Sequence, residues 1–109
     1  MQDPAFHISI ENRSIIRSAE IAKALSHPAR IAILKILFEK KASTCGEITE
    51  ILPLAQATVS QHLKALKTVG LINSKSEGVR IFYCLSQRGI KELQSVLSDL
   101  SDEFVHKCC

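Results

Sequence analysis

The sequence has no apolar run long enough to cross a membrane. Its longest nearly apolar stretch, residues 31–38, is interrupted by Lys35, whereas a membrane-spanning helix needs about 20 apolar residues in a row. The first ten residues also lack the basic stretch and the apolar segment of a secretory signal peptide. We therefore expect a cytoplasmic protein with no membrane partner, in which the four cysteines are free thiols or ligands rather than a disulfide framework.

Sequence motifs of common enzymes are also missing. There is no Gly-rich phosphate loop and no paired-carboxylate motif, and the histidines and cysteines are scattered along the chain. Internal repeats, low-complexity tracts and long linkers are absent as well. A chain of 109 residues, 46% of them apolar, has enough material for one hydrophobic core but not for two. We therefore expect a non-enzymatic protein that forms a single domain over residues 1–109.

Charge is unevenly distributed along the chain. Residues 53–91 contain six lysines and arginines against one acidic residue, Glu77, whereas residues 92–109 contain four acidic residues against Lys107. A basic middle next to an acidic end favours a surface that faces a polyanion such as nucleic acid. Ordinary solvation of surface charges is the alternative explanation.

Hydrophobic periodicity predicts five helices and one β-hairpin. The predicted helices cover residues 11–25, 28–40, 45–52, 56–69 and 87–106, and the predicted strands cover residues 71–76 and 79–85 with Glu77-Gly78 as the turn. Residues 1–10 are expected to form a loose N-terminal arm, and residues 107–109 a C-terminal tail. The predicted fold is therefore mainly α with a small β-hairpin.

Capping residues support several of these helix ends. Thr44 and Glu47 have the spacing of a capping box, which predicts that a helix begins directly after Thr44. Gly70 follows the fourth helix, where a left-handed residue often ends a helix. We expect His27 or Ser26 to cap the second helix, which would begin at Pro28, and for His27 we prefer capping over the role of a ligand.

The first and last helices each carry an apolar stripe. The stripe residues recur at steps of three or four and are Ile15, Ala19, Ala22 and Leu25 in the first helix, and Ile90, Leu93, Leu97, Leu100 and Phe104 in the last. The second helix is apolar over a broad face within residues 31–38, which predicts a place in the core. A chain this small cannot hide both terminal stripes in one core, so we expect a symmetric homodimer formed through the first and last helices.

The fourth helix has the residues of a DNA-reading helix. With Val59, Leu63 and Leu66 directed inward, small and amide side chains lie outward near its start and lysines lie later, which is typical of a helix that enters the major groove. The candidate DNA-binding residues are Gln56, Thr58, Ser60, Gln61, His62, Lys64 and Lys67 on this helix and Lys75 and Arg80 on the hairpin. A third helix, a turn, this helix and a basic hairpin together predict a winged helix-turn-helix.

Individual roles within this set differ. Gln61 can pair with adenine through two hydrogen bonds, whereas Lys64 and Lys67 are better placed for phosphates. Lys75 and Arg80 would form a basic wing along the neighbouring minor groove. His62 falls beside the apolar stripe, so packing is its first interpretation and DNA contact its second. Polar side chains that are merely solvated are the alternative for the whole face.

Two segments resemble the ArsR/SmtB family of winged-helix repressors. Residues 24–34 (ALSHPARIAIL) are similar to the family's opening motif, and residues 56–66 (QATVSQHLKAL) are similar to its recognition-helix signature. Residues 70–72 and 82–85 continue the resemblance, which covers roughly residues 15–100. The resemblance implies a cytoplasmic homodimeric repressor that binds a double-stranded operator and is released by an inducer, often a metal ion. The family usually has Ser where this chain has Ala55, which cannot cap the recognition helix.

The usual metal sites of the family are not evident in this sequence. Metal-sensing members resemble one another in a Cys-Val-Cys pair at the third helix, where this chain has Thr44-Cys45-Gly46. The family's other site uses carboxylate and His pairs on the last helix, which here has only His106 near three acidic residues. A zinc or cobalt sensor of the usual design is therefore disfavoured.

The remaining candidates for an inducer site are the cysteine thiols. Cys108 and Cys109 are adjacent and have no packing reason to be there, and vicinal thiols chelate soft ions such as arsenite. No cofactor is otherwise specified, and the two thiols are candidate metalloid ligands. Three alternatives stay open: a thiol-redox or persulfide sensor in the same fold, a functionless tail, and a winged-helix module that contacts proteins without binding DNA.

Overall fold

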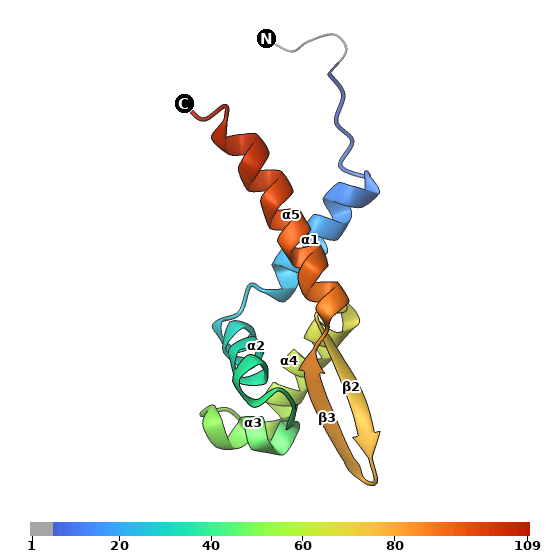
Figure 1. The fold of residues 1–109 in the computed structure, drawn as a ribbon, viewed down its shortest axis with the longest axis vertical. Coiled ribbons are helices and arrows are strands. Elements are labelled where there is room, and N and C mark those ends of the chain that lie inside the picture. The colour runs from blue at the N-terminus through green and yellow to red at the C-terminus, as the bar shows by residue number, and fades with distance from the viewer. Residues whose placement is uncertain (1–5) are drawn as a thin grey trace.

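In the computed structural model, residues 6–109 are described, and they form a mostly helical domain with a small sheet. The helices are α1 Arg13–Ala24, α2 Pro28–Lys40, α3 Cys45–Ile51, α4 Gln56–Thr68 and α5 Gln87–Val105, and the strands are β1 Ser43–Thr44, β2 Ile72–Glu77 and β3 Arg80–Leu85. Figure 1 shows that α2, α3, α4 and the β2–β3 hairpin form the body of the domain, while α1 and α5 cross and project away from it. The predicted mainly α fold with a hairpin wing is confirmed.

Both ends of the described segment, residues 6–109, have little regular structure. Part of the predicted N-terminal arm, residues 1–5, lies outside the described residues, and residues 6–12 form neither a helix nor a strand. At the other end, α5 stops at Val105 and residues 106–109 follow without regular structure. Within residues 6–109, none of the helices is both long and apolar enough to cross a bilayer.

Local capping chemistry fixes most of the helix ends. The Thr44 Oγ1 atom accepts a hydrogen bond from the Glu47 backbone N–H at 3.1 Å, and the Glu47 carboxylate accepts one from the Thr44 N–H at 2.8 Å, so the predicted capping box is confirmed. Gly70 has a φ of 82°, as expected after α4.

His27 occupies the N-cap position of α2 as predicted, but its side chain makes no capping hydrogen bond, and its ring lies 5.4 Å from that of His62. The Ser26 hydroxyl does not cap α2 either, because it donates to the Lys23 carbonyl at 2.7 Å.

The sheet has three antiparallel strands in the order β1-β3-β2. The short strand β1 was not predicted, because two residues are too few to show an alternating pattern. The hairpin turn falls at Gly78-Val79, one residue later than predicted, since Glu77 pairs with Arg80. Gly78 has a φ of 62°, which suits the first position of a two-residue hairpin loop. The wing is therefore a hairpin that is tied to the body by β1.

The core lies between α2, α3, α4 and the sheet. Its fully buried apolar side chains include Ile33, Leu37, Ile48, Val59, Leu63, Leu66, Leu71 and Ile72. The prediction that the apolar face of α2 lies in the core is corrected for Ile31 and Phe38, which are 38% and 71% exposed. The core residues predicted on this face are Ile31, Ile33, Leu34, Ile36, Leu37 and Phe38. Because the body covers only one side of α2, apolar residues on its other sides stay in contact with solvent.

The apolar stripes of α1 and α5 are only partly covered by the rest of the chain. On α1, Ile21 and Ala24 are buried against the body, whereas Ala19 and Ala22, which belong to the stripe assigned to a second copy, are exposed in the single chain. Farther from the body, Ile15 is 44% exposed. On α5, Leu97, Leu100 and Phe104 are 56%, 42% and 58% exposed. Both projecting helices therefore carry apolar side chains that this chain itself does not bury.

The start of α4 offers a test of capping. Ala55 occupies the N-cap position in extended backbone conformation and makes no side-chain cap. Replacing Ala55 with Ser should supply an acceptor for the first-turn N–H groups and raise the free energy of unfolding by about 1 kcal/mol, measured by urea denaturation.

The matched control is Ala57→Ser, two positions into the same helix, where no cap is available and serine lowers helix propensity slightly. Equal free energies of unfolding for the two serine variants would contradict the capping argument.

Candidate nucleic-acid interface

The α3–turn–α4 unit is held in the body by the apolar side of α4. Val59, Leu63 and Leu66 each have 0% exposure, and α3 packs against α4. The turn between them is tightened by a hydrogen bond from the Leu54 N–H to the Leu52 carbonyl at 2.8 Å. Two short helices joined in this way form a helix-turn-helix. Since the buried stripe fixes the rotation of α4, it also decides which residues face solvent.

The outward side of α4 carries the predicted polar set. Gln56, Thr58, Ser60, Gln61, Lys64 and Lys67 are all exposed. Thr68 is also exposed, but its hydroxyl donates a hydrogen bond to the Lys64 carbonyl at 2.8 Å. The face therefore presents amide and hydroxyl groups along the first half of the helix and ammonium groups along the second half, an arrangement suited to base edges and phosphates respectively.

His62 has a structural role on the side of α4 that meets α2. It is half-buried, and its Nδ1 atom accepts a hydrogen bond from the Arg30 Nε–H at 3.1 Å. Arg30 also donates to the Ala24 carbonyl at 3.4 Å, and so links the end of α1 to α4. Loss of hydration on burial lowers the pKa of His62, and the positive charges of Arg30 and His27 lower it further. The packing interpretation of His62 agrees with these contacts.

Lys75 and Arg80, on the two strands of the wing, are both exposed. The Arg80 guanidinium lies 4.9 Å from the centre of the Phe82 ring and 4.0 Å from the Glu47 carboxylate. The hydrogen bond from the Thr44 N–H is the main reason that the pKa of Glu47 is lowered, with a smaller contribution from Arg80. Arg80 thus borders a groove of about 350 Å³ between the wing and α4, which Gln56 and Ser60 also line.

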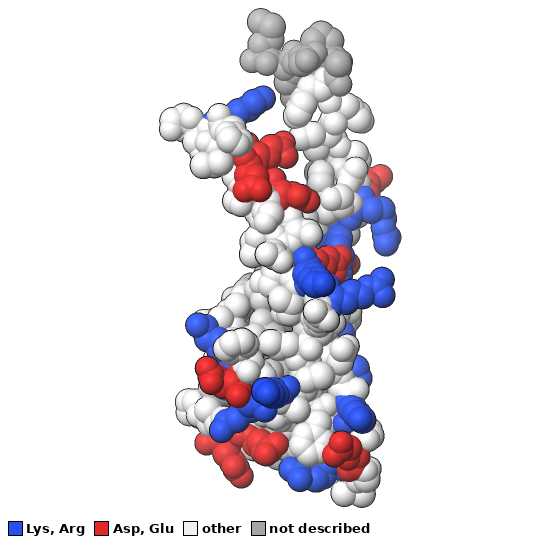
Figure 2. Space-filling view, in the orientation of Figure 1, with Lys and Arg blue, Asp and Glu red and all other residues white. Residues whose placement is uncertain are grey.

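A second groove, of about 510 Å³, lies on the other side of the exposed face of α4. Its polar and charged lining includes Gln61 and Lys64 from α4, Arg17, Glu20 and Lys23 from α1, and Arg30 from α2. Basic side chains therefore lie on both sides of the polar face of α4. The acidic residues of α5 lie elsewhere: Figure 2 shows red side chains gathered near its far end, where Asp99, Asp102 and Glu103 are exposed.

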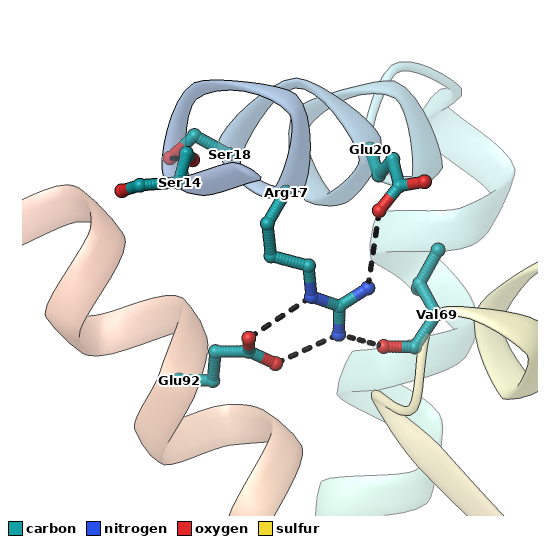
Figure 3. Close-up of polar contacts among 6 residues, drawn as sticks. All are labelled: Ser14, Arg17, Ser18, Glu20, Val69 and Glu92. Atoms are coloured by element: carbon teal, nitrogen blue, oxygen red, sulfur yellow. Dashed lines mark hydrogen bonds and ion pairs between the residues drawn. The ribbon is translucent and has the colours of Figure 1, made fainter. Parts of the chain in front are cut away.

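One polar cluster near this interface was not found from the sequence. The Arg17 guanidinium, on α1, donates to both carboxylate oxygens of Glu92, on α5, at 2.9 and 2.7 Å. It also donates to the Val69 carbonyl at the end of α4, at 2.6 Å. Figure 3 shows these contacts together with the weaker ion pair to Glu20. The partners are 52 and 75 residues from Arg17, so no local pattern could reveal them.

The thiols are distributed over three places. Cys45 and Cys84 are half-buried, and Cys45 lines the groove between the wing and α4. Cys108 and Cys109 are exposed, and the Cys108 thiol donates to the Phe104 carbonyl at 3.0 Å. Among the residues that the structure describes, no three His, Cys, Asp or Glu side chains are grouped closely enough to hold a metal ion.

Comparison with known proteins identifies the class. A family profile described as the bacterial regulatory protein arsR family matches residues 27–74. The transcriptional repressor PagR of Bacillus anthracis is 32% identical over 91 residues, which are 84% of this chain and 91% of that protein. The chain is therefore a winged helix-turn-helix transcriptional regulator rather than an enzyme.

Solved structures agree with this class. HlyU from Vibrio cholerae N16961 superposes with a TM-score of 0.66 at 30% identity, covering 82% of this chain and 96% of that one; HlyU is described as a transcriptional activator. A homodimeric winged helix-turn-helix DNA-binding domain, Mb0332 from Mycobacterium bovis, has the same fold with a TM-score of 0.68 at 24% identity, over 96% and 97% of the two chains. The chain belongs to the arsR family of bacterial regulatory proteins, as its sequence motifs indicated.

The burial of His62 beside Arg30 predicts a dependence of stability on pH. Because the pKa of His62 is lower in the folded chain than its ordinary value of 6.5, the unfolded chain binds the proton more readily. The stabilisation is therefore complete above that value and is lost as the pH falls through the folded-state pKa. The measurement is urea denaturation at pH 7.5 and again at a pH below 6.5. Between these two pH values, the free energy of unfolding should decrease less for His62→Asn than for the wild type.

The variant His106→Asn, at an exposed position beyond α5, is the matched control for loss of a histidine. Parallel pH profiles for the wild type and His62→Asn would show that His62 does not carry the effect.

Proposed function

We propose that the chain is a homodimeric repressor that inserts α4 into the major groove of a pseudo-palindromic operator and lays its wing along the neighbouring minor groove. The observation that carries this proposal is the division of α4 into two sides. Its apolar stripe is fully buried, while Gln61, Lys64 and their neighbours are exposed between two grooves that have basic side chains. A helix that only packed in the body would not need this exposed set.

The dimer is supported by the projecting helices. Ile15 on α1 and Leu97, Leu100 and Phe104 on α5 are substantially exposed in the single chain. Exposed apolar surface of this kind favours burial in an interface. A two-fold symmetric contact between these helices would cover the same patch on both copies and would place two recognition helices on one side of the dimer.

Repression is proposed rather than activation because a dimer can repress simply by occupying its operator, which needs only the DNA-binding face described above. The relatives include both a repressor and an activator by name. The named alternative, a module that contacts only proteins, differs in one measurable property. A DNA-binding surface with several phosphate contacts must lose affinity steeply as salt concentration rises.

The test begins by selecting duplexes with the wild-type protein from a random-sequence library. We expect a two-half-site duplex that binds two chains and weakens with salt. Gln61→Ala should lose about 1–3 kcal/mol of binding to the selected duplex but little on random DNA, because it removes a base contact. Lys64→Ala should weaken binding to both, and should reduce the salt slope by about 1 for one lost phosphate contact.

Fluorescence anisotropy at several salt concentrations measures these effects, and light scattering gives the stoichiometry. Ser98→Ala, on the exposed side of α5, serves as the control and should bind like the wild type. Failure of the wild type to bind any duplex, or binding by one chain with full affinity, would overturn the proposed function.

For the inducer, the proposal is a thiol-directed ligand or oxidant that acts at Cys108 and Cys109. Both thiols are exposed. They follow the end of α5, the helix that carries Phe104 and is assigned to the dimer contact. Arsenite binds thiolates, and a redox or persulfide signal would act on the same atoms. To release DNA, either event must change the geometry of the dimer, which requires a coupling of about 1–3 kcal/mol between the two sites.

The double variant Cys108→Ser/Cys109→Ser should bind DNA normally in reducing buffer and should no longer be released by arsenite or hydrogen peroxide. Anisotropy with the selected duplex, before and after each treatment, measures this release. The variant Cys84→Ser is the control for a half-buried thiol. The same release in the double variant as in the wild type would assign the effect to another group.

A further inference from the structure

Three helices meet at Arg17. This residue lies on α1, and its guanidinium contacts α5 through Glu92 and the end of α4 through the Val69 carbonyl (Figure 3). The contact to Glu92 uses two parallel N–H donors, which fixes direction as well as distance. The contact to Val69 reaches the C-cap residue of α4, where a helix leaves carbonyl groups without intrahelical partners.

The surrounding backbone shows that this junction is tightly packed. Gly89, in the first turn of α5, lies against the Gly70 carbonyl, and a Cβ atom at Gly89 would collide with it. Gly70 itself needs its positive φ to lead the chain from α4 into β2. The end of α4 and the start of α5 are therefore in backbone contact, and Arg17 adds α1 to the same point.

We propose that Arg17 is a positioning residue that fixes the orientation of the recognition helix relative to the helices of the dimer contact. The inference rests on the proposed function. The helices α1 and α5 carry the exposed apolar patch, and α4 carries the DNA-reading face. Arg17 lies on α1, and its side chain contacts α5 and the C-terminal end of α4. Its hydrogen-bond and ion-pair partners within residues 6–109 include no DNA-reading side chain, although Arg17 lines the same groove as Gln61 and Lys64.

Such a role has a specific consequence for binding to two half-sites. Once one recognition helix is bound, the second binds at an effective concentration that depends on how well the dimer fixes its position. Half-sites are read one helical turn or a multiple of it apart, so a loose joint between α4 and the dimer helices lowers that effective concentration. The affinity of one recognition helix for one half-site does not depend on this joint.

The experiment uses the full chain and the duplex selected by the wild-type protein, together with the same duplex in which one half-site is randomised. Arg17→Met keeps the aliphatic stem but removes every donor. We expect it to lose about tenfold in affinity for the two-half-site duplex and less than about twofold for the one-half-site duplex. Arg17→Lys, with one ammonium in place of the planar fork, should lie between Arg17→Met and the wild type.

A change in spacing gives a second readout that a general loss of stability would not produce. Two extra base pairs between the half-sites rotate them by about 70°. The wild type should lose most of its preference for two half-sites on this duplex, whereas Arg17→Met should lose a smaller fraction. The matched control is Arg13→Met, which removes the same charge from an exposed position on α1 and should affect both duplexes equally.

Equal losses on the two duplexes for Arg17→Met, or wild-type affinity for both, would overturn the proposal. If Arg17→Met does not fold, Glu92→Gln decides, because it weakens the contact to α5 and leaves the Val69 carbonyl in place; it should show a smaller loss with the same preference. Failure of the wild type to bind either duplex would instead contradict the proposed function, so the two failures are distinguishable.

Discussion

Burial of one side of α4 is the constraint on which the rest of the structure depends. A helix of 13 residues is marginal in water by itself, and each fully buried Val or Leu side chain contributes about 1.5–3 kcal/mol. Val59, Leu63 and Leu66 are completely covered by the body. Their burial fixes the rotation of α4 and leaves its polar side in solvent. The DNA-reading face is thus a direct result of how the core is packed.

The link between this body and the projecting helices is of a different kind. Ile21 and Ala24 bury the end of α1, whereas Arg17 and Glu92 join α1 to α5 through a partly exposed polar contact. Exposed ion pairs contribute little to stability, whereas a forked arginine contact is specific in geometry. The hydrogen bond from Arg17 lowers the pKa of Glu92, so the carboxylate stays ionised to a lower pH than an ordinary glutamate does. This junction therefore contributes more to the geometry between α1 and α5 than to the free energy of unfolding.

The same division accounts for the distribution of charge. Basic residues border the exposed side of α4 through the two grooves and the wing, while Asp99, Asp102 and Glu103 lie toward the far end of α5, away from the wing (Figure 2). A polyanion would be attracted to the first region and repelled by the second, which favours one mode of approach. The exposed thiols follow the acidic end of α5, so a signal at Cys108 would reach DNA only through the dimer helices.

The sequence by itself determined the features that depend on neighbours three or four residues apart. Local hydrogen bonding and helical periodicity predict the capping box of Thr44 and Glu47, the start of α2 at Pro28 and the buried stripe of α4. The same periodicity predicts which residues of α4 are exposed in the candidate interface. The family resemblance rests on the same segments. Each of these features depends on residues within one or two helical turns, where neighbours in sequence are also neighbours in space.

Only the tertiary structure decided the features that join distant segments. The pairing of β1 with β3, the rotation of the buried face of α1 and the place of His27 beside His62 depend on which elements happen to meet. The contact of Arg17 with Glu92 spans 75 residues and has no sequence period that could indicate it. Its physical reason is geometric: α1 and α5 cross where α4 ends, and a long, forked cation is able to reach both.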